Sequence, residues 1–250
     1  MPLCLLLAAA GTIHCDSSDP SRTGFHFQPA AHPTEYSVMN DPNGIFRDHR
    51  GLFHMFAQFR YTNASFAEAQ PSGVGWLHAV SLDSLAWTHL PMALRPQAPW
   101  ECGGIFSGSA TWVEGQPVLA YAVECNEAIG LALPANASDP LLTAWEKPEY
   151  DPAVRHMPDY NFRDPVTAFH PADPGHPPAA EEWRMAVGCS GHLCTFRSAD
   201  FKSWRDAGIM YHVPGQHMWE CPGTLYAVQA ASCHAMPYHV SSACHTHTLI

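Results

Sequence analysis

Three short acidic motifs hold the residues of this sequence that are best suited to chemistry. Each places a carboxylate close to a proline: Asn-Asp-Pro-Asn-Gly at residues 40–44, Phe-Arg-Asp-Pro at 162–165 and Trp-Glu-Cys-Pro at 219–222. Cleavage of an acetal needs one carboxyl group to attack or stabilise the cationic carbon and another to protonate the leaving oxygen. Asp41, Asp164 and Glu220 would supply these two groups and a third. Each motif taken alone is also common turn chemistry.

A second pattern recurs along the chain at a nearly constant interval. A serine and an aspartate precede a tryptophan three times, and Trp87, Trp145 and Trp204 are 58 and 59 residues apart. Asp41 lies ahead of the first copy, Asp164 ahead of the third, and Glu220 opens a fourth unit. A repeat of this length is typical of a β-propeller.

The segments between the turn signals predict short strands. Residues 51–59 and 117–123 are apolar runs of strand length, bounded by Gly, Pro, Asn and Asp. The 23 prolines and 17 glycines fit four-stranded antiparallel blades joined by tight turns. The innermost strand of every blade begins at the central channel, so equivalent positions of successive blades converge there. We therefore expect an all-β propeller in which the three acidic motifs meet.

The order of these motifs resembles glycoside hydrolase family 32, the invertase and β-fructofuranosidase family, over residues 25–226. Three further segments add to the resemblance: Gln58 after its Gly-Leu-Phe-His strand, residues 76–83 with Trp87 behind them, and Phe-Ser-Gly-Ser-Ala-Thr at 106–111. The resemblance implies a five-bladed propeller fold. It also implies a retaining glycosidase that cleaves β-fructofuranosidic bonds of sucrose or fructans, without a metal or cofactor.

The resemblance assigns a role to each acidic residue. Asp41 would be the nucleophile, Glu220 the general acid and base, and Asp164 the stabiliser of the transition state. A retaining mechanism requires the two reacting carboxyl groups to be about 5 Å apart. Arg163 would hold Asp164 ionised and donate hydrogen bonds to a sugar hydroxyl.

Polar and aromatic residues near the motifs resemble the family's substrate-binding positions. They are Asn40, Gln58, Phe66, Phe106, Ser107 and Arg163. Phe66 stands where the family often has a tryptophan. Judged from residue type alone, Asn40 could serve only the turn, Gln58 could face water, and Ser107 could simply be small enough for a crowded channel.

Some positions depart from the family pattern. Val38 replaces a tryptophan before the first motif, and Gly223 replaces an aspartate after the third. A second Trp-Glu-Cys occurs at residues 100–102, and we interpret Glu101 as a loop residue because no proline follows and it falls outside the blade register. A fructosyltransferase and a truncated, inactive fragment with residual sugar binding stay open as alternatives. Related propeller glycosidases of arabinose or xylose polymers fit the first motif and the Phe-Ser-Gly-Ser segment less well.

The expected domain organisation has three parts. Residues 1–15 resemble a short signal peptide, residues 25–226 an incomplete propeller, and residues 227–250 a Cys- and His-rich tail that we expect to be disordered. Five blades would need roughly 290 residues. Since 211 residues run from Asn40 to Ile250, we expect about three and a half blades and no C-terminal β-sandwich. The tail has no Cys-x-x-Cys pair, so we expect no zinc site there.

Composition limits the partners and the compartment. The net charge of −11, with only 12 Lys and Arg residues, argues against nucleic acid or an anionic membrane as a partner. No apolar run reaches the length of a membrane span. Sequons at Asn63 and Asn136 and nine cysteines fit an oxidising compartment. We therefore expect an extracellular or vacuolar protein, although the sequence does not pair the cysteines.

Overall fold

The computed structural model describes most of the region between residues 38 and 223. The described residues are 27, 38–60, 73–123, 125, 128–155, 161–170, 182–212, 214–215 and 217–223. The expected signal peptide, Phe66, Asn63 and the tail at 227–250 all lie outside them. Among the described residues, no helix is long and apolar enough to cross a membrane.

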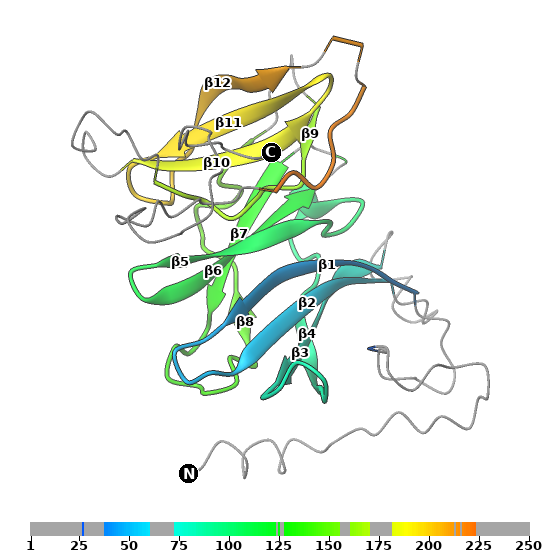
Figure 1. Ribbon diagram of the computed structural model, residues 1–250, viewed down its shortest axis with the longest axis vertical. Coiled ribbons are helices and arrows are strands. Elements are labelled where there is room, and N and C mark those ends of the chain that lie inside the picture. Colours follow the sequence, from blue (N-terminus) through cyan, green and yellow to red (C-terminus); the bar gives the residue numbers. More distant parts are fainter. Residues whose placement is uncertain are drawn as a thin grey trace, which may run out of the picture.

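Within the described residues, twelve strands form three four-stranded antiparallel sheets, as the sequence predicts for propeller blades (Figure 1). The first sheet contains β1 (Val38–Arg47), β2 (Phe53–Arg60), β3 (Val74–Ser81) and β4 (Thr88–Leu94). The second contains β5 (Gly108–Val113), β6 (Gln116–Val123), β7 (Ala128–Pro134) and β8 (Trp145–Glu146). The third contains β9 (Phe162–Arg163), β10 (Trp183–Cys189), β11 (His192–Ser198) and β12 (Arg205–His212). In each sheet the strands lie side by side in chain order.

The tryptophan pattern marks the same turn before the fourth strand in the first and third sheets. In the first sheet, Ser81 Oγ donates to Asp83 Oδ1 over 3.0 Å, and Asp83 Oδ1 accepts two backbone N–H groups of the next turn. Trp87 then donates its indole N–H to the carbonyl of Ser84 (3.2 Å) directly before β4. Residues 198–204 repeat the same hydrogen bonds before β12. In these two sheets a short polar turn motif thus fixes where the outer strand starts.

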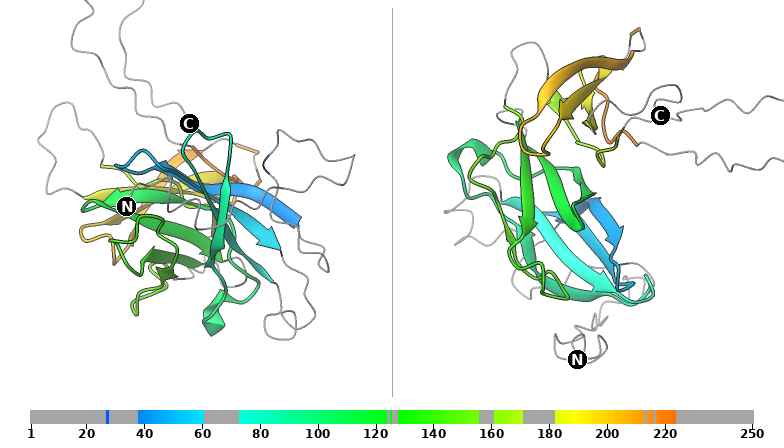
Figure 2. Two further views of the ribbon diagram at one scale, coloured as in Figure 1. Left: turned by 90° about the horizontal axis from the view of Figure 1, so that it is seen from below. Right: turned by 90° about the vertical axis from the view of Figure 1, so that its left-hand side faces the viewer.

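The three sheets follow one another along the molecule, with the second in the middle (Figures 1 and 2). Leu119 of β6 joins Phe56 of β2 in one apolar cluster. Val118, the neighbouring residue in β6, joins Phe196 of β11 in another. Because successive residues of a strand point to opposite faces, the middle sheet is buried on both sides. This stacking orients the inner strands β1, β5 and β9 toward a common site.

Candidate active site

Asp41 lies at an irregularity of β1, where its pairing with β2 shifts register between Met39 and Pro42. Its Oδ2 atom accepts hydrogen bonds from Ser107 Oγ (2.7 Å) and Gln58 Nε2 (3.3 Å). Gln58 Nε2 also donates to Ser107 Oγ over 2.6 Å. Gln58 and Ser107 are both buried, at 6% and 4% exposure, so Gln58 does not face water. Two neutral donors from two blades therefore orient the exposed Asp41 carboxylate.

Two residues that we did not select from the sequence hold this part of the site together. Asn43 is buried, and its Oδ1 accepts the backbone N–H of Gly108 (3.2 Å), which ties β1 to β5. Trp76 donates its indole N–H to the carbonyl of Phe106 (2.9 Å) and so fixes the segment before β5. Both residues lie in the motifs that carried the resemblance. Their roles were not evident because each depends on a contact with another blade.

Asp164 follows β9 in a left-handed backbone conformation, with φ of 57°. Its Oδ2 accepts the backbone N–H of Cys221 (2.8 Å) and lies 3.6 Å from the Cys221 sulfur. Burial raises the pKa of Asp164, while the Cys221 bonds and the charge of Arg163 lower it to a smaller extent. The positive charge of Arg163 thus acts on the pKa of Asp164 in the expected direction, but burial has the larger effect.

Glu220 is exposed, with 62% of its side chain accessible. Its Oε1 accepts from Arg163 Nη1 at 3.2 Å, so the structure pairs Arg163 with Glu220. The segment that carries Glu220 is held from behind by the third sheet. There the Trp219 N–H donates to the Cys189 carbonyl over 3.1 Å.

A cavity of about 260 Å³ joins the three motifs. Its wall is formed by Pro42, Asn43, Ser107, Gly108, Ser109, Asp164, Pro165, Val166, Thr167, Cys221, Pro222 and Gly223. Cys221 is at the centre of this arrangement. Burial and the charges of Asp164 and Asp41 raise the pKa of its thiol to about 11, so the thiol stays neutral. Asp41, Glu220 and Asn40 are exposed, the Arg163 side chain is partly accessible, and none of these four residues lines the cavity.

The family model of the glycosyl hydrolases family 32 N-terminal domain matches residues 26–248 of this chain. The chain belongs to this family. It is 38% identical over 227 residues to Beta-fructofuranosidase 1 of Zea mays, a match that covers 84% of this chain and 31% of the maize protein. It is 36% identical to Acid beta-fructofuranosidase 1, vacuolar, of a Rosa hybrid cultivar, over 80% of this chain and 33% of the rose protein. The chain thus spans about a third of the length of these curated relatives.

Solved structures of family 32 proteins share the fold. The structure of fructan 1-exohydrolase IIa from Cichorium intybus superposes with a TM-score of 0.68 at 31% sequence identity. The superposition covers 82% of this chain and 37% of the chicory chain. A glutamate-to-glutamine variant of the chicory enzyme has been solved in complex with 1-kestose. The three sheets described above therefore correspond to part of a family 32 propeller.

Proposed function

We propose that this chain carries the catalytic site of a retaining β-fructofuranosidase that acts on sucrose or fructans. The observation that carries the proposal is that three acidic motifs, distant in the sequence, all contribute residues to the wall of one cavity. Asp164 contacts Cys221, and Arg163 contacts Glu220. The charge of Asp41 raises the pKa of the Cys221 thiol, and a hydrogen bond with Ser107 lowers it. The names of the maize, rose and chicory relatives favour a fructosyl substrate.

Asp41 is the nucleophile in this proposal. Both of its side-chain hydrogen bonds end on Oδ2, so Oδ1 is the oxygen that attacks the anomeric carbon of the fructosyl unit. Donation by Ser107 and Gln58 stabilises the carboxylate and fixes its orientation before substrate binds. The anomeric carbon then forms a bond to Oδ1 as the bond to the leaving oxygen breaks.

Glu220 is the general acid and base. In the first step it donates a proton to the leaving oxygen, and in the second it removes a proton from the water that releases fructose. The contact of Arg163 Nη1 with Glu220 Oε1 holds the carboxyl group in place for both steps. The exposure of Glu220 suits a group that must reach both the departing sugar and water.

Asp164 is proposed to bind fructose hydroxyls from inside the cavity. Its Oδ2 is occupied by the Cys221 N–H, which leaves the other oxygen for the sugar. Asn40, Phe66, Phe106 and Arg163 stay predictions as substrate contacts, and Phe66 lies outside the described residues.

The test is fructose release from sucrose and from 1-kestose by the purified chain. Asp41→Asn removes the nucleophile without changing the size of the side chain, and we expect the rate to fall more than about a thousandfold. Glu149→Gln is the matched control, because Glu149 is exposed and lines no part of the cavity. No release from a folded sample, or release that Asp41→Asn leaves intact, would overturn the proposal. Equal release of glucose and fructose from sucrose identifies hydrolysis, and an excess of glucose identifies transfer to a sugar.

We also propose a vacuolar or extracellular location. The rose relative is named vacuolar, and two disulfides, Cys102–Cys125 and Cys189–Cys194, fit an oxidising compartment. Asn136 of the second sequon is exposed and accessible to a glycosyltransferase. Mass spectrometry of the secreted chain before and after removal of N-linked glycans tests this point.

A further inference from the structure

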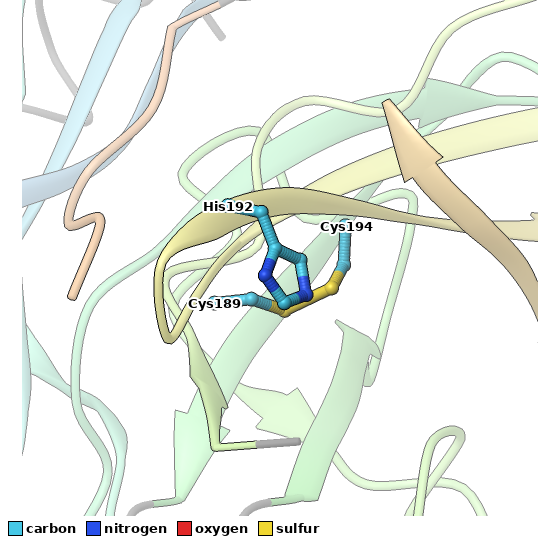
Figure 3. Close-up of side chains that lie close together, drawn as sticks. All are labelled: Cys189, His192 and Cys194. Atoms are coloured by element: carbon cyan, nitrogen blue, oxygen red, sulfur yellow. A yellow bond between two sulfur atoms is a disulfide. The ribbon is translucent and has the colours of Figure 1, made fainter. Parts of the chain in front are cut away.

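A second group of reactive side chains lies on one face of the β10–β11 hairpin. The sulfur atoms of Cys189 and Cys194 and a ring nitrogen of His192 all lie within 4.8 Å of one another (Figure 3). These residue types could ligate a soft metal ion. The two sulfurs are bonded to each other, however, so neither offers the thiolate that a metal needs. The group is therefore a cross-link that closes the hairpin around its Ser190-Gly191 turn.

This cross-link stands between the two segments that carry Asp164 and Glu220. On one side, Cys189 and Gly188 pair with Phe162 and Arg163 of β9, directly before Asp164. On the other side, the Cys189 carbonyl accepts the N–H of Trp219, directly before Glu220. Ser190 also forms an antiparallel bridge with Met218, and the Gly191 N–H donates to the carbonyl of His217. One end of a single hairpin thus supports both acidic motifs.

The backbone contact at this place is unusually close. A Cβ atom on Gly188 would lie 1.9 Å from the carbonyl oxygen of Trp219, so only glycine allows the present approach. Any outward movement or rotation of the hairpin end would therefore displace the Trp219 segment. Such a movement would shift Glu220 relative to Arg163 and the cavity.

We propose that the Cys189–Cys194 disulfide positions the acid-base residue by fixing the hairpin end on which the Trp219 segment rests. Cys189 and Cys194 are positioning residues, since neither touches the substrate. The proposal rests on the role proposed above for Glu220. A dithiol reductant would release the constraint: the two cysteines take up two electrons and two protons, and the reductant becomes a disulfide.

The first experiment compares two cysteine-pair variants of the full chain. Cys189→Ala/Cys194→Ala removes this cross-link, and Cys102→Ala/Cys125→Ala removes the other disulfide, which lies between η1 (Pro99–Glu101) and the second sheet. We expect the first variant to lower kcat for sucrose about tenfold to a hundredfold while KM changes little, because a shift of about 1 Å in a catalytic group has this size of effect. The control is expected to lose stability but to keep its kcat.

Amide hydrogen exchange gives a readout that does not depend on activity. The peptide containing Trp219 should exchange at least about tenfold faster in the first variant and unchanged in the control. A folded first variant with wild-type exchange at Trp219 and wild-type kcat would overturn the proposal. If even the wild-type chain released no fructose, the exchange result would still decide whether the disulfide holds this segment.

A second route covers the case in which the first variant fails to fold. Gly188→Ala keeps the disulfide but pushes on the Trp219 carbonyl, so it should reproduce the loss of kcat and the faster exchange. Dithiol reduction of the Cys102→Ala/Cys125→Ala protein should do the same, with a chelator present because the freed thiols and His192 would then form a soft ligand set. Wild-type behaviour in both would rule the proposal out.

Discussion

Residues 100–102 and 219–221 have the same sequence, Trp-Glu-Cys, and lie in opposite environments. The Glu101 side chain is fully buried, whereas 62% of the Glu220 side chain is accessible. Each glutamate faces one cation: Lys147 for Glu101 and Arg163 for Glu220. Cys102 is cross-linked, and Cys221 is a free thiol. The difference shows that the tripeptide itself does not determine whether its glutamate is structural or chemical.

Every oxygen of Glu101 is occupied by protein groups. Oε2 accepts the N–H groups of Gln97 and Ala98, at 2.6 and 2.8 Å, and Oε1 accepts from Tyr121 Oη (2.8 Å) and Lys147 Nζ. Glu101 therefore closes its own turn and connects it to the second sheet. A carboxylate bound in this way cannot transfer protons to a substrate. Glu220 can, because its side chain is exposed and its partner in the described part of the chain is the partly accessible Arg163.

Of the two glutamates, the exposed one should have the larger effect on catalysis when it is removed. Glu220→Gln keeps the size of the side chain but abolishes proton transfer, so kcat for sucrose should fall about a hundredfold to ten-thousandfold. The free energy of unfolding should change by less than about 1 kcal/mol, because the side chain is mostly in water. Steady-state kinetics and urea unfolding measure the two quantities. A Glu220→Gln variant that loses several kcal/mol of stability but keeps its kcat would contradict this assignment.

Removal of the buried glutamate should affect stability instead. Glu101→Gln leaves Lys147 buried without its countercharge, and we expect a loss of about 3–5 kcal/mol in the free energy of unfolding. The kcat of the protein that stays folded should be unchanged. The control is Glu101→Gln/Lys147→Met, which removes both charges and should regain much of the loss. Equal losses in the single and double variants would show that the ion pair is not what Glu101 contributes.

The sequence predicted those features that depend on neighbouring residues or on repeats. The recurrent Ser, Asp and Trp residues correspond to a real turn in the first and third sheets. The contacts of Gln58 and Ser107 with Asp41 were not predicted, because they join residues 17 and 66 positions apart. The interpretation of Glu101 as an ordinary loop residue missed its burial. That burial depends on Tyr121, which is 20 residues away along the chain and is supplied by the second sheet.

Long side chains and cysteines were the least predictable. Arg163 is next to Asp164 in sequence, but its flexible side chain reaches Glu220, 57 residues away. The disulfides also depend on strand register: Cys194 pairs with Val187, which places it on the same face of the sheet as Cys189. Sequence spacing does not reveal either contact without the register of the third sheet.

Asp151, which lies close to Glu101 and Tyr121, should also make the stability of the protein depend on pH. Burial raises the pKa of Asp151 to about 7, the N–H of Leu131 opposes this rise, and the charge of Glu101 adds to it. Its ordinary value is 3.8, so from about pH 4 to 7 the unfolded chain ionises while the folded chain stays protonated. This group therefore lowers stability as pH rises through that window, by up to about 4 kcal/mol.

The Asp151→Asn variant isolates this effect. Asparagine does not ionise and keeps an oxygen for the Leu131 N–H, so the difference from wild type should grow in favour of the variant from about pH 4 to 7. His54 acts in the opposite sense. Burial lowers its pKa from 6.5 to about 4, so the folded chain loses stability as the pH falls through that range. Because both proteins contain His54, subtraction of the two urea-unfolding profiles removes it. A difference that does not vary with pH would contradict the assignment.

The smallest expected effect is that of Arg163, the cation that pairs with Glu220 in the exposed Trp-Glu-Cys segment. Arg163→Met removes the partner of Glu220, but the pair is 32% and 62% accessible, so water and salt already screen it. We expect the free energy of unfolding to change by less than about 1 kcal/mol, and the change to shrink further at high salt. Lys147→Met is the matched variant at the buried copy, where the same type of substitution leaves Glu101 as an unpaired buried charge and should cost about 3 kcal/mol or more. Urea unfolding of the two variants at low and high salt compares them directly. Similar losses in the two variants would mean that burial of the glutamate does not explain the difference between the two Trp-Glu-Cys copies.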